Sequence, residues 1–381
     1  MGRKKLGTDV FAEAVSRMLP LYENGHRVVV SFSAGKDSGV CLEVCIEAAK
    51  LAGRLPVDVV MRDEEIMFPG TFEYAERVYE RKDEVNLVWL IASQPVINVF
   101  NRTQPYFWVF DPDVPEDEWV RKPPDYAYYH PHKDITRMVT PELFPPAEGK
   151  TIYSVIGLRV QESKGRMYGL FSSKGYLTKP NRLGIILARP IYDWSDGDVC
   201  KAHRDFGWDY NSAYDTMLKR GVPKKLMRIA PPTMNQRGVD LLRFARDSWP
   251  QWFDRVAHRC PGVRTAADYG SRAVIPTRKS GESWEDVFHR ECIERAPEWI
   301  AERSREAERR LLGTHARHST APFPDIHPCD QCVGENGSWK NLANFLYCGD
   351  PFSVKMSFLP YVEPEFFKEG KGTWGGTPAF T

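Results

Sequence analysis

The sequence predicts an α/β protein with a doubly wound parallel sheet and a smaller, mostly helical C-terminal domain. Three observations lead to this fold class. Up to residue 91, β-branched runs alternate with apolar residues at helical spacing, which is typical of βαβ units. A turn of small residues directly follows the first of these runs. After about residue 245 the sequence becomes helical and charged.

The first elements follow from hydrophobic periodicity and from stop signals such as Gly53. We expect helix 9–24, strand 28–30, helix 37–53, strand 55–61, helix 71–82 and strand 86–91. In a parallel sheet of this kind, ligands bind at the carboxyl ends of the strands. The turn after residue 30 and the acidic turn at Asp63 should therefore share one edge of the sheet.

The alternation breaks at residues 101–150, which are rich in Pro, Trp, Tyr and Asp. Long irregular segments in compact domains are usually functional, so we interpret this one as an inserted lid or substrate loop. Beyond it we expect strands 151–158 and 185–190 and a helix over 198–206, which Ser195 and Asp196 begin. The predicted domains are 1–245, with the 101–150 insertion, and 246–381.

Composition favours a globular protein of the cytoplasm. The chain has 381 residues, 42% of them hydrophobic, and a net charge of +1. No apolar run reaches the ~18 residues that a membrane helix needs, and the N-terminal residues lack the apolar core of a secretory signal. Leu6 argues against myristoylation. Eight cysteines in such a chain predict thiols or metal ligands rather than a disulfide framework.

Positive charge is concentrated in two stretches. Residues 150–189 contain eight Lys or Arg and one acidic residue, and residues 217–246 have the same ratio. Such stretches suit a polyanionic ligand, and they make nucleic acid a candidate partner. A solvated basic surface is the alternative.

A predicted anion site lies between the first strand and the helix that follows it. Its residues are Ser31, Ser33, Ala34, Gly35, Lys36, Asp37 and Ser38. Small side chains let backbone N–H groups reach a ligand, and the helix dipole favours negative charge there. Lys36 adds a point charge. The segment therefore predicts a site for phosphate, pyrophosphate or sulfate. It is not a Walker A motif, because Val30 and Asp37 stand where that motif needs Gly and Ser or Thr.

Residues 33–38, Ser-Ala-Gly-Lys-Asp-Ser, resemble the Ser-Gly-Gly-Lys-Asp-Ser signature of the PP-loop nucleotide α-hydrolases. The resemblance implies that this loop holds the pyrophosphate of ATP or the corresponding phosphosulfate. Ala34 replaces the first Gly of the signature.

A second segment, residues 63–71, is similar to the stretch after the second strand of phosphoadenosine phosphosulfate (PAPS) reductases. Phe68, Pro69 and Thr71 match that stretch, although its Gly is missing. The resemblance places Asp63 and Phe68 near the adenosine of a nucleotide. A purely structural turn at the strand end is the alternative.

A third segment, residues 157–166, resembles the family's Gly-x-Arg-Arg-x-x-Ser-x-x-Arg pattern. Guanidinium groups bind phosphate and sulfate oxygens through two parallel hydrogen bonds. Arg159 and Arg166 are therefore candidate partners for the anion at Lys36. Val160 stands where the family has its second Arg, which argues against strict specificity for sulfonucleotides.

Residues 190–199 resemble the family's Pro-x-x-Asp-Trp-x-x-x-Asp-Val, and residues 210–214 resemble its Asn-Pro-Leu-Tyr. We expect Asp193 and Trp194 to have an architectural role. The chain is thus similar to the PAPS reductase-like family of the PP-loop superfamily over about residues 25–215. That family includes sulfonucleotide reductases, sulfate-activating ATP enzymes and DNA phosphorothioation enzymes.

The C-terminal cysteines suggest a metal site. Cys329 and Cys332 have chelating spacing and Cys348 follows, with Cys260 or His327 as the fourth ligand. The phosphorothioation enzymes carry a four-cysteine cluster, so the resemblance implies [4Fe-4S], while Zn²⁺ and unligated thiols stay open. The remaining cysteines, Cys41, Cys45, Cys200 and Cys292, are expected to be structural.

These motifs and their resemblance predict that the protein is an ATP pyrophosphatase. It would cleave ATP between the α and β phosphates and adenylate a substrate for sulfur transfer or modification, plausibly a nucleic acid, with Mg²⁺ and a sulfur-donor or partner protein. Lys36, Asp37, Arg159 and Arg166 are the predicted catalytic residues, with Asp37 orienting the loop or contacting Mg²⁺. The chain lacks the C-terminal Cys and the Cys-Cys pair of true reductases. Reduction of PAPS or adenylylsulfate is therefore the second interpretation of the function, and a nucleotide-binding regulator without catalytic activity is the third.

Overall fold

The computed structural model describes residues 7–130, 138–173, 175–223, 227–233, 238–270, 274–329 and 336–369. The chain forms two compact units. Unit 1 comprises residues 1–94 and 121–230, and unit 2 comprises residues 95–120 and 231–381. The predicted division into domains 1–245 and 246–381 stays a prediction.

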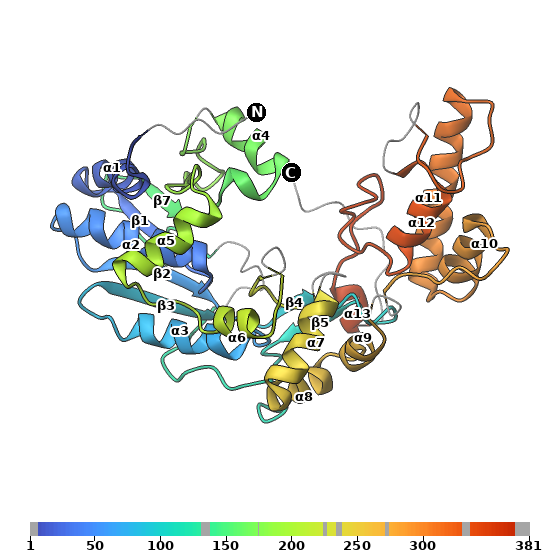
Figure 1. Ribbon diagram of the computed structural model, residues 1–381, viewed down its shortest axis with the longest axis horizontal. Coiled ribbons are helices and arrows are strands. Elements are labelled where there is room, and N and C mark those ends of the chain that lie inside the picture. Colours follow the sequence, from blue (N-terminus) through green and yellow to red (C-terminus); the bar gives the residue numbers. More distant parts are fainter. Residues whose placement is uncertain are drawn as a thin grey trace. The chain divides into compact units, whose positions relative to one another are not determined.

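Unit 1 is built on a parallel sheet. Its described strands are β1 (Arg27–Ser31), β2 (Val57–Arg62), β3 (Val85–Ile91), β6 (Tyr128–Tyr129), β7 (Ile152–Val155) and β8 (Ile186–Ala188). They lie in the order β6-β3-β2-β1-β7-β8, and each adjacent pair is parallel. Figure 1 shows this sheet with helices beside it. The predicted α/β fold class with a helical C-terminal region is confirmed.

Helices surround the sheet in unit 1. They are α1 (Val10–Glu23), α2 (Lys36–Leu51), α3 (Pro69–Tyr79), α4 (Lys164–Ser173), α5 (Asp196–Phe206) and α6 (Ala213–Lys219), with a 3-10 turn η1 (Val160–Glu162) before α4. Helix α2 packs against α1 and α5 and against strands β1 and β2. Asp9 caps α1, because its carboxylate accepts hydrogen bonds from the N–H groups of Phe11 and Ala12. Ser195 and Asp198 form a reciprocal cap at the start of α5.

Part of one face of the sheet is covered by residues from the segment that we interpreted as an inserted lid or substrate loop. Val29, Val60 and Leu90, from three adjacent strands, pack with Val139 and Phe144. The predicted insertion, residues 101–150, therefore supplies part of the core of unit 1. It is also less irregular than expected, because it contains β6 and β5 (Tyr106–Val109), which pairs with β4 (Gln94–Ile97).

Unit 2 is mainly helical. Its described helices are α7 (Gly238–Ser248), α8 (Pro250–Arg259), α9 (Val263–Tyr269), α10 (Trp284–Phe288), α11 (Glu298–His318), α12 (Trp339–Leu346) and α13 (Glu365–Glu369), with a π-helical segment η4 (His289–Glu294). Apolar side chains of α10, α11 and α12, including Phe288, Leu311 and Leu342, form its main core. Arg303 is fully buried there and donates to backbone carbonyls of Gly349 and Asp350. Its role is therefore structural.

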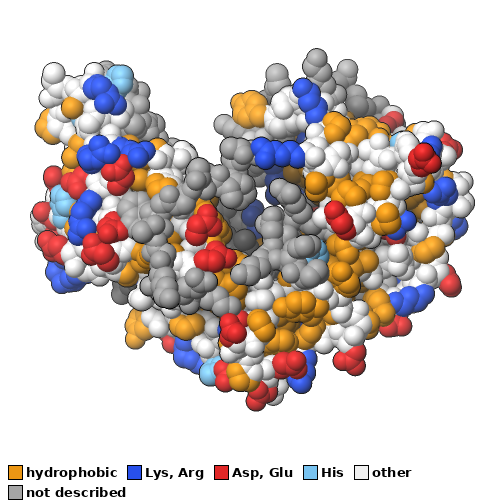
Figure 2. All heavy atoms as spheres, turned by 180° about the vertical axis from the view of Figure 1, so that it is seen from behind, with side chains coloured by type: hydrophobic (Ala, Val, Ile, Leu, Met, Phe, Trp, Pro, Cys, Tyr) orange, Lys and Arg blue, Asp and Glu red, His pale blue; other side chains and the backbone are white. Residues whose placement is uncertain are grey.

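The described surface carries both signs of charge. In Figure 2 the Lys and Arg side chains of the visible face alternate with Asp and Glu, which agrees with the net charge of +1. None of the described helices combines the length and apolar character that a membrane crossing requires.

Candidate active site

The turn between β1 and α2 is held by a serine of the helix. Ser38 Oγ accepts hydrogen bonds from the N–H groups of Ser33 and Gly35, each at 3.2 Å, and lies 3.1 Å from Ser33 Oγ. The side chain of Ser38 is buried, so these contacts fix the turn from inside. The start of α2 then presents backbone N–H groups and the positive end of its dipole, as an anion site requires.

Ala34 has a left-handed backbone, with φ of +53°, at the position where the resembled signature has Gly. A Cβ in this conformation costs about 1–2 kcal/mol, which glycine avoids. We therefore expect Ala34→Gly to raise the free energy of unfolding by about 0.5–1 kcal/mol, measured by urea unfolding. Ala48→Gly, in the interior of α2, should lower it instead. Equal losses for the two variants would contradict the strain at Ala34.

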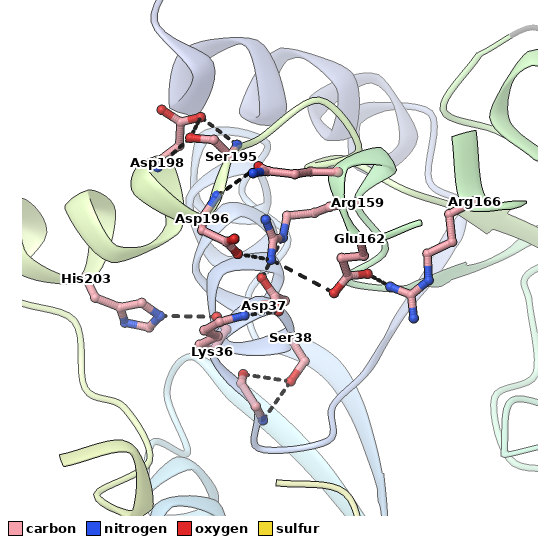
Figure 3. Close-up of polar contacts among 12 residues, drawn as sticks. Lys36, Asp37, Ser38, Arg159, Glu162, Arg166, Ser195, Asp196, Asp198 and His203 are labelled. Carbon is pink, nitrogen blue, oxygen red and sulfur yellow. Dashed lines mark hydrogen bonds and ion pairs between the residues drawn. The ribbon is translucent and has the colours of Figure 1, made fainter. Parts of the chain in front are cut away.

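Lys36, Asp37 and Arg159 form one ion-paired group at the start of α2. Lys36 Nζ donates to Asp37 Oδ2 at 2.7 Å, and Arg159 Nε donates to Asp37 Oδ1 at 2.7 Å. Arg159 Nη2 also donates to Asp196 Oδ1 at 2.7 Å. Figure 3 shows Arg159 between the two carboxylates. Elements that follow β1, β7 and β8 thus meet at the carboxyl edge of the sheet, as predicted for a ligand site.

Arg159 is the most deeply buried charge of this group, with 1% of its side chain exposed. Burial lowers its pKa, but the carboxylates of Asp37 and Asp196 outweigh that effect and the pKa is raised. Its Nη1 atom is buried and has no hydrogen-bond partner among the residues that the structure describes. A buried donor without a partner costs free energy unless a ligand or water satisfies it. This donor therefore favours a bound anion beside Arg159.

The segment that carries Arg159 approaches α2 very closely. A Cβ added to Gly157 would lie 2.8 Å from the carbonyl carbon of Asp37 and 3.0 Å from the backbone nitrogen of Ser38. Both atoms are backbone, so neither moves out of the way easily. The glycine of the resembled pattern is thus required here by space.

Residues of the segment 211–214 and of α5 also contact the loop. Asn211 is fully buried, and its Nδ2 donates to Ala34 O at 3.1 Å and to Thr71 Oγ1 at 2.9 Å. Tyr214 Oη accepts a hydrogen bond from the backbone N–H of Lys36 at 3.3 Å. Desolvation raises the pKa of Tyr214, so the phenol stays protonated. His203 Nε2 lies 3.1 Å from Lys36 O, within hydrogen-bonding distance.

Arg166 lies on α4 and is paired with Glu162 of η1 (Figure 3). Glu162 Oε1 is also 3.9 Å from Arg159 Nη2, so the two predicted arginines share one carboxylate. Burial lowers the pKa of Arg166, and the positive charges of Arg228 and Arg159 lower it further. The structure thus links Arg166 to Arg159 through Glu162.

Asp63 and Phe68 occupy a separate network after β2. Asp63 is fully buried and accepts hydrogen bonds from Trp89 Nε1 at 2.9 Å and from the Glu65 N–H at 2.9 Å. It also pairs with Arg121, whose guanidinium lies over the ring of Phe72. These contacts give Asp63 a structural role at the strand end. Its predicted contact with an adenosine, and that of buried Phe68, stay predictions.

Ser31 lies in β1, where its Oγ is 3.1 Å from Ser154 Oγ of β7. This contact links two neighbouring strands of the sheet. The predicted role of Ser31 in nucleotide binding stays a prediction.

The predicted metal ligands are only partly described. Cys332 lies outside the described residues. Cys260 is buried, Cys348 Sγ lies 3.6 Å from Val274 O, and burial raises the pKa of Cys348 to about 12. No three His, Cys, Asp or Glu side chains of the described ranges are placed to hold a metal ion. Cys260, Cys329 and Cys348 therefore do not assemble a site by themselves, and the iron–sulfur or zinc site stays a prediction.

Cys41, Cys45 and Cys292 are buried, as expected for core positions. Cys200 was expected to be structural, but its side chain is exposed on α5.

Several residues of the site were not predicted from the sequence as site residues. They are Glu162, Asp196, His203, Asn211 and Tyr214. Glu162, Asp196, Asn211 and Tyr214 lie within motifs that we quoted for their resemblance, so a signal was present although no role in the site was assigned to them. His203 lies in no motif, and its contact with Lys36 depends on how α5 packs on α2.

No protein-family model matches the sequence. A curated relative, the uncharacterized protein YbdN of Escherichia coli (strain K12), is 25% identical over 359 residues. The match covers 88% of this chain and 86% of YbdN. The similarity therefore extends through both units of the chain.

Solved structures that resemble part of this chain include those of the following three proteins. Candida glabrata FMN adenylyltransferase with FMN and an ATP analog is 12% identical, with a TM-score of 0.35, 56% of this chain covered and 64% of that chain. PAPS reductase from Candida auris is 13% identical (TM-score 0.27; 56% and 94% covered). The U34-tRNA thiolase NcsA from Methanococcus maripaludis, with its [4Fe-4S] cluster, is 14% identical (TM-score 0.32; 69% and 77% covered). The chain thus spans just under two thirds of the adenylyltransferase.

Proposed function

We propose that unit 1 is a PP-loop enzyme that cleaves ATP between its α and β phosphates and adenylates an acceptor. The main support is the group at the start of α2. There a turn of small residues, Lys36 and buried Arg159 meet at the carboxyl edge of a parallel sheet, and Arg159 Nη1 lacks a partner in the described structure. A polyphosphate chain supplies the acceptor oxygens that these donors need.

In the proposed reaction the acceptor attacks the α-phosphorus of ATP. The bond from this phosphorus to the oxygen that bridges to the β-phosphate breaks, and pyrophosphate leaves with the electron pair. Lys36, Arg159 and Arg166 neutralise the charge that develops on the leaving group. Backbone N–H groups of residues 33–36 orient the phosphates, so that positioning and electrostatics carry most of the catalysis.

Mg²⁺ usually binds one or two carboxylates together with phosphate oxygens of its substrate. Asp37 fits this requirement as a carboxylate of the loop, although both its oxygens are engaged by Lys36 and Arg159 in this structure. When bound, the ion would neutralise phosphate charge. Lys36, released from Asp37, would then be free to contact the nucleotide.

The acceptor is proposed to be a nucleic acid or another substrate of sulfur transfer or modification, supplied with sulfur by a donor or partner protein. Lys179, Arg182 and Lys219 are exposed on unit 1 and suit a polyanion. Arg159 and Arg189 are buried, so they do not add to a basic surface. The surface charge is thus smaller than the sequence count suggests.

Reduction of a sulfonucleotide is the second candidate, and one observation favours it. Cys200 is exposed and lies one helical turn after Asp196 on α5, and the carboxylate of Asp196 pairs with Arg159. A thiol there is placed near the anion loop. Sulfite release from PAPS that is lost in Cys200→Ser would identify this reaction, whereas nucleotide binding without turnover would identify the regulator.

We expect Lys36→Ala to weaken ATP binding by about 1.5–3 kcal/mol, the scale of a charge-assisted contact. Pyrophosphate release from ATP should fall with it. Titration calorimetry and a pyrophosphate assay measure the two effects. Lys50→Ala, at the other end of α2, removes the same charge and should change neither. If Lys36→Ala binds ATP as tightly as the parent, the loop is not the nucleotide site.

A further inference from the structure

A short segment of unit 1, residues 227–230, lies against the anion loop. Ile229 Cδ1 is 3.4 Å from the position that a Cβ on Gly35 would occupy, and Tyr214 Oη is 3.6 Å from the same point. Ile229 thus lies close to the turn, and this closeness places its neighbour in the chain, Arg228, at the rim of the site.

Arg228 differs from the other cations around the loop because no acidic side chain pairs with it in the part of the chain that the structure describes. Lys36 and Arg159 are paired with Asp37, and Arg166 is paired with Glu162. Arg228 is exposed and forms no ion pair with any residue in the described ranges. Its positive charge acts directly on Arg166, whose pKa it lowers.

Two like charges that act on each other without a shared carboxylate repel each other, and this repulsion is unfavourable in the ligand-free protein. A ligand with several negative charges turns the repulsion into attraction. Lys36 and Arg159, at the start of α2, can together neutralise the charge of a single phosphate group once Lys36 is released from Asp37. An additional arginine at the rim therefore favours a ligand that extends beyond one phosphate.

We propose that Arg228 binds the terminal phosphates of a nucleoside triphosphate, so that with Arg166 it selects ligands with a polyphosphate chain over monophosphates. The proposal rests on the proposed function of the loop. It adds Arg228 to Lys36, Arg159 and Arg166 as a further group that binds the leaving pyrophosphate.

The test compares the affinities of the full-length protein for ATP, inorganic pyrophosphate and AMP by titration calorimetry. We expect Arg228→Ala to weaken binding of ATP and pyrophosphate about 10- to 100-fold and to leave AMP binding unchanged. Arg228→Lys should recover part of the lost affinity. The ammonium group keeps the positive charge, but it cannot donate the two parallel hydrogen bonds of a guanidinium group. Arg54→Ala removes the same charge near the opposite end of α2 and should have no effect.

Lys36→Ala, measured in parallel, separates this proposal from the function on which it rests. If Lys36→Ala weakens ATP binding and Arg228→Ala does not, the role of Arg228 is wrong and the nucleotide site stands. If neither variant weakens binding, the nucleotide site itself is wrong. An equal loss for ATP and AMP in Arg228→Ala would overturn the selection for chain length. Arg228 is exposed, so its variants should fold, and thermal unfolding checks this.

Discussion

Arg159→Lys is expected to lower the free energy of unfolding by about 2–3 kcal/mol and to abolish pyrophosphate release from ATP. Arg159 uses Nε for Asp37 and Nη2 for Asp196, and one ammonium group cannot occupy both positions. Most of the loss of stability should come from Asp37, because Asp196 is 66% exposed and solvent screens its pairing. Urea unfolding and a pyrophosphate assay on the folded variant measure the two effects.

Arg17→Lys is the matched control for this variant. Arg17 of α1 also forms a bidentate ion pair, with Asp193. This ion pair joins α1 to the loop before α5. Within the described structure Arg17 forms no hydrogen bond or ion pair with residues 33–38, so Arg17→Lys should lose stability but keep its turnover while folded. If Arg159→Lys behaves in the same way, the role of Arg159 is structural and not catalytic.

Gly157→Ala should cost about 1–3 kcal/mol of stability and severely weaken ATP binding. Its new Cβ would meet the backbone of Asp37 and Ser38 at 3.0 Å or less, so the start of α2 must shift. A small displacement of positioning groups lowers catalysis strongly. Gly169→Ala on α4 is the control, because a Cβ there meets nothing within 4 Å. If Gly157→Ala binds ATP with the affinity of the wild type, the loop tolerates this shift and the expectation is wrong.

The first part of the fold could be predicted from the sequence because it rests on local signals. The β-branched run 28–30, the stop at Gly53 and the Ser195 cap each involve neighbouring residues, and β1, α2 and α5 form close to where they were expected. Segment 138–144 could not be assigned in this way. Val139 and Phe144 are buried by strands far away in the sequence, and no periodicity records that contact.

The same distinction holds for the candidate site. Lys36 was predicted because a cation at a small-residue turn suits an anion, and Arg159 and Arg166 were predicted because their segment resembles the arginine pattern of the family. Their partners Asp196 and His203 depend on the packing of α5 against α2, which a linear pattern does not specify. Asp63 shows why the sequence alone leaves such a role open, since a carboxylate after a strand can serve Trp89 and Arg121 as well as a ligand.

The support of the loop by Asn211 and Tyr214 has a consequence for the order in which the protein is made. A ribosome completes β1 and α2 early, but the groups that hold Ala34 O and the Lys36 N–H are synthesised more than 170 residues later. A nascent chain that stops before residue 211 therefore has the loop sequence without its scaffold. Nucleotide binding during translation would then begin only after unit 1 is nearly complete, and capture of ATP would report that this unit has finished folding.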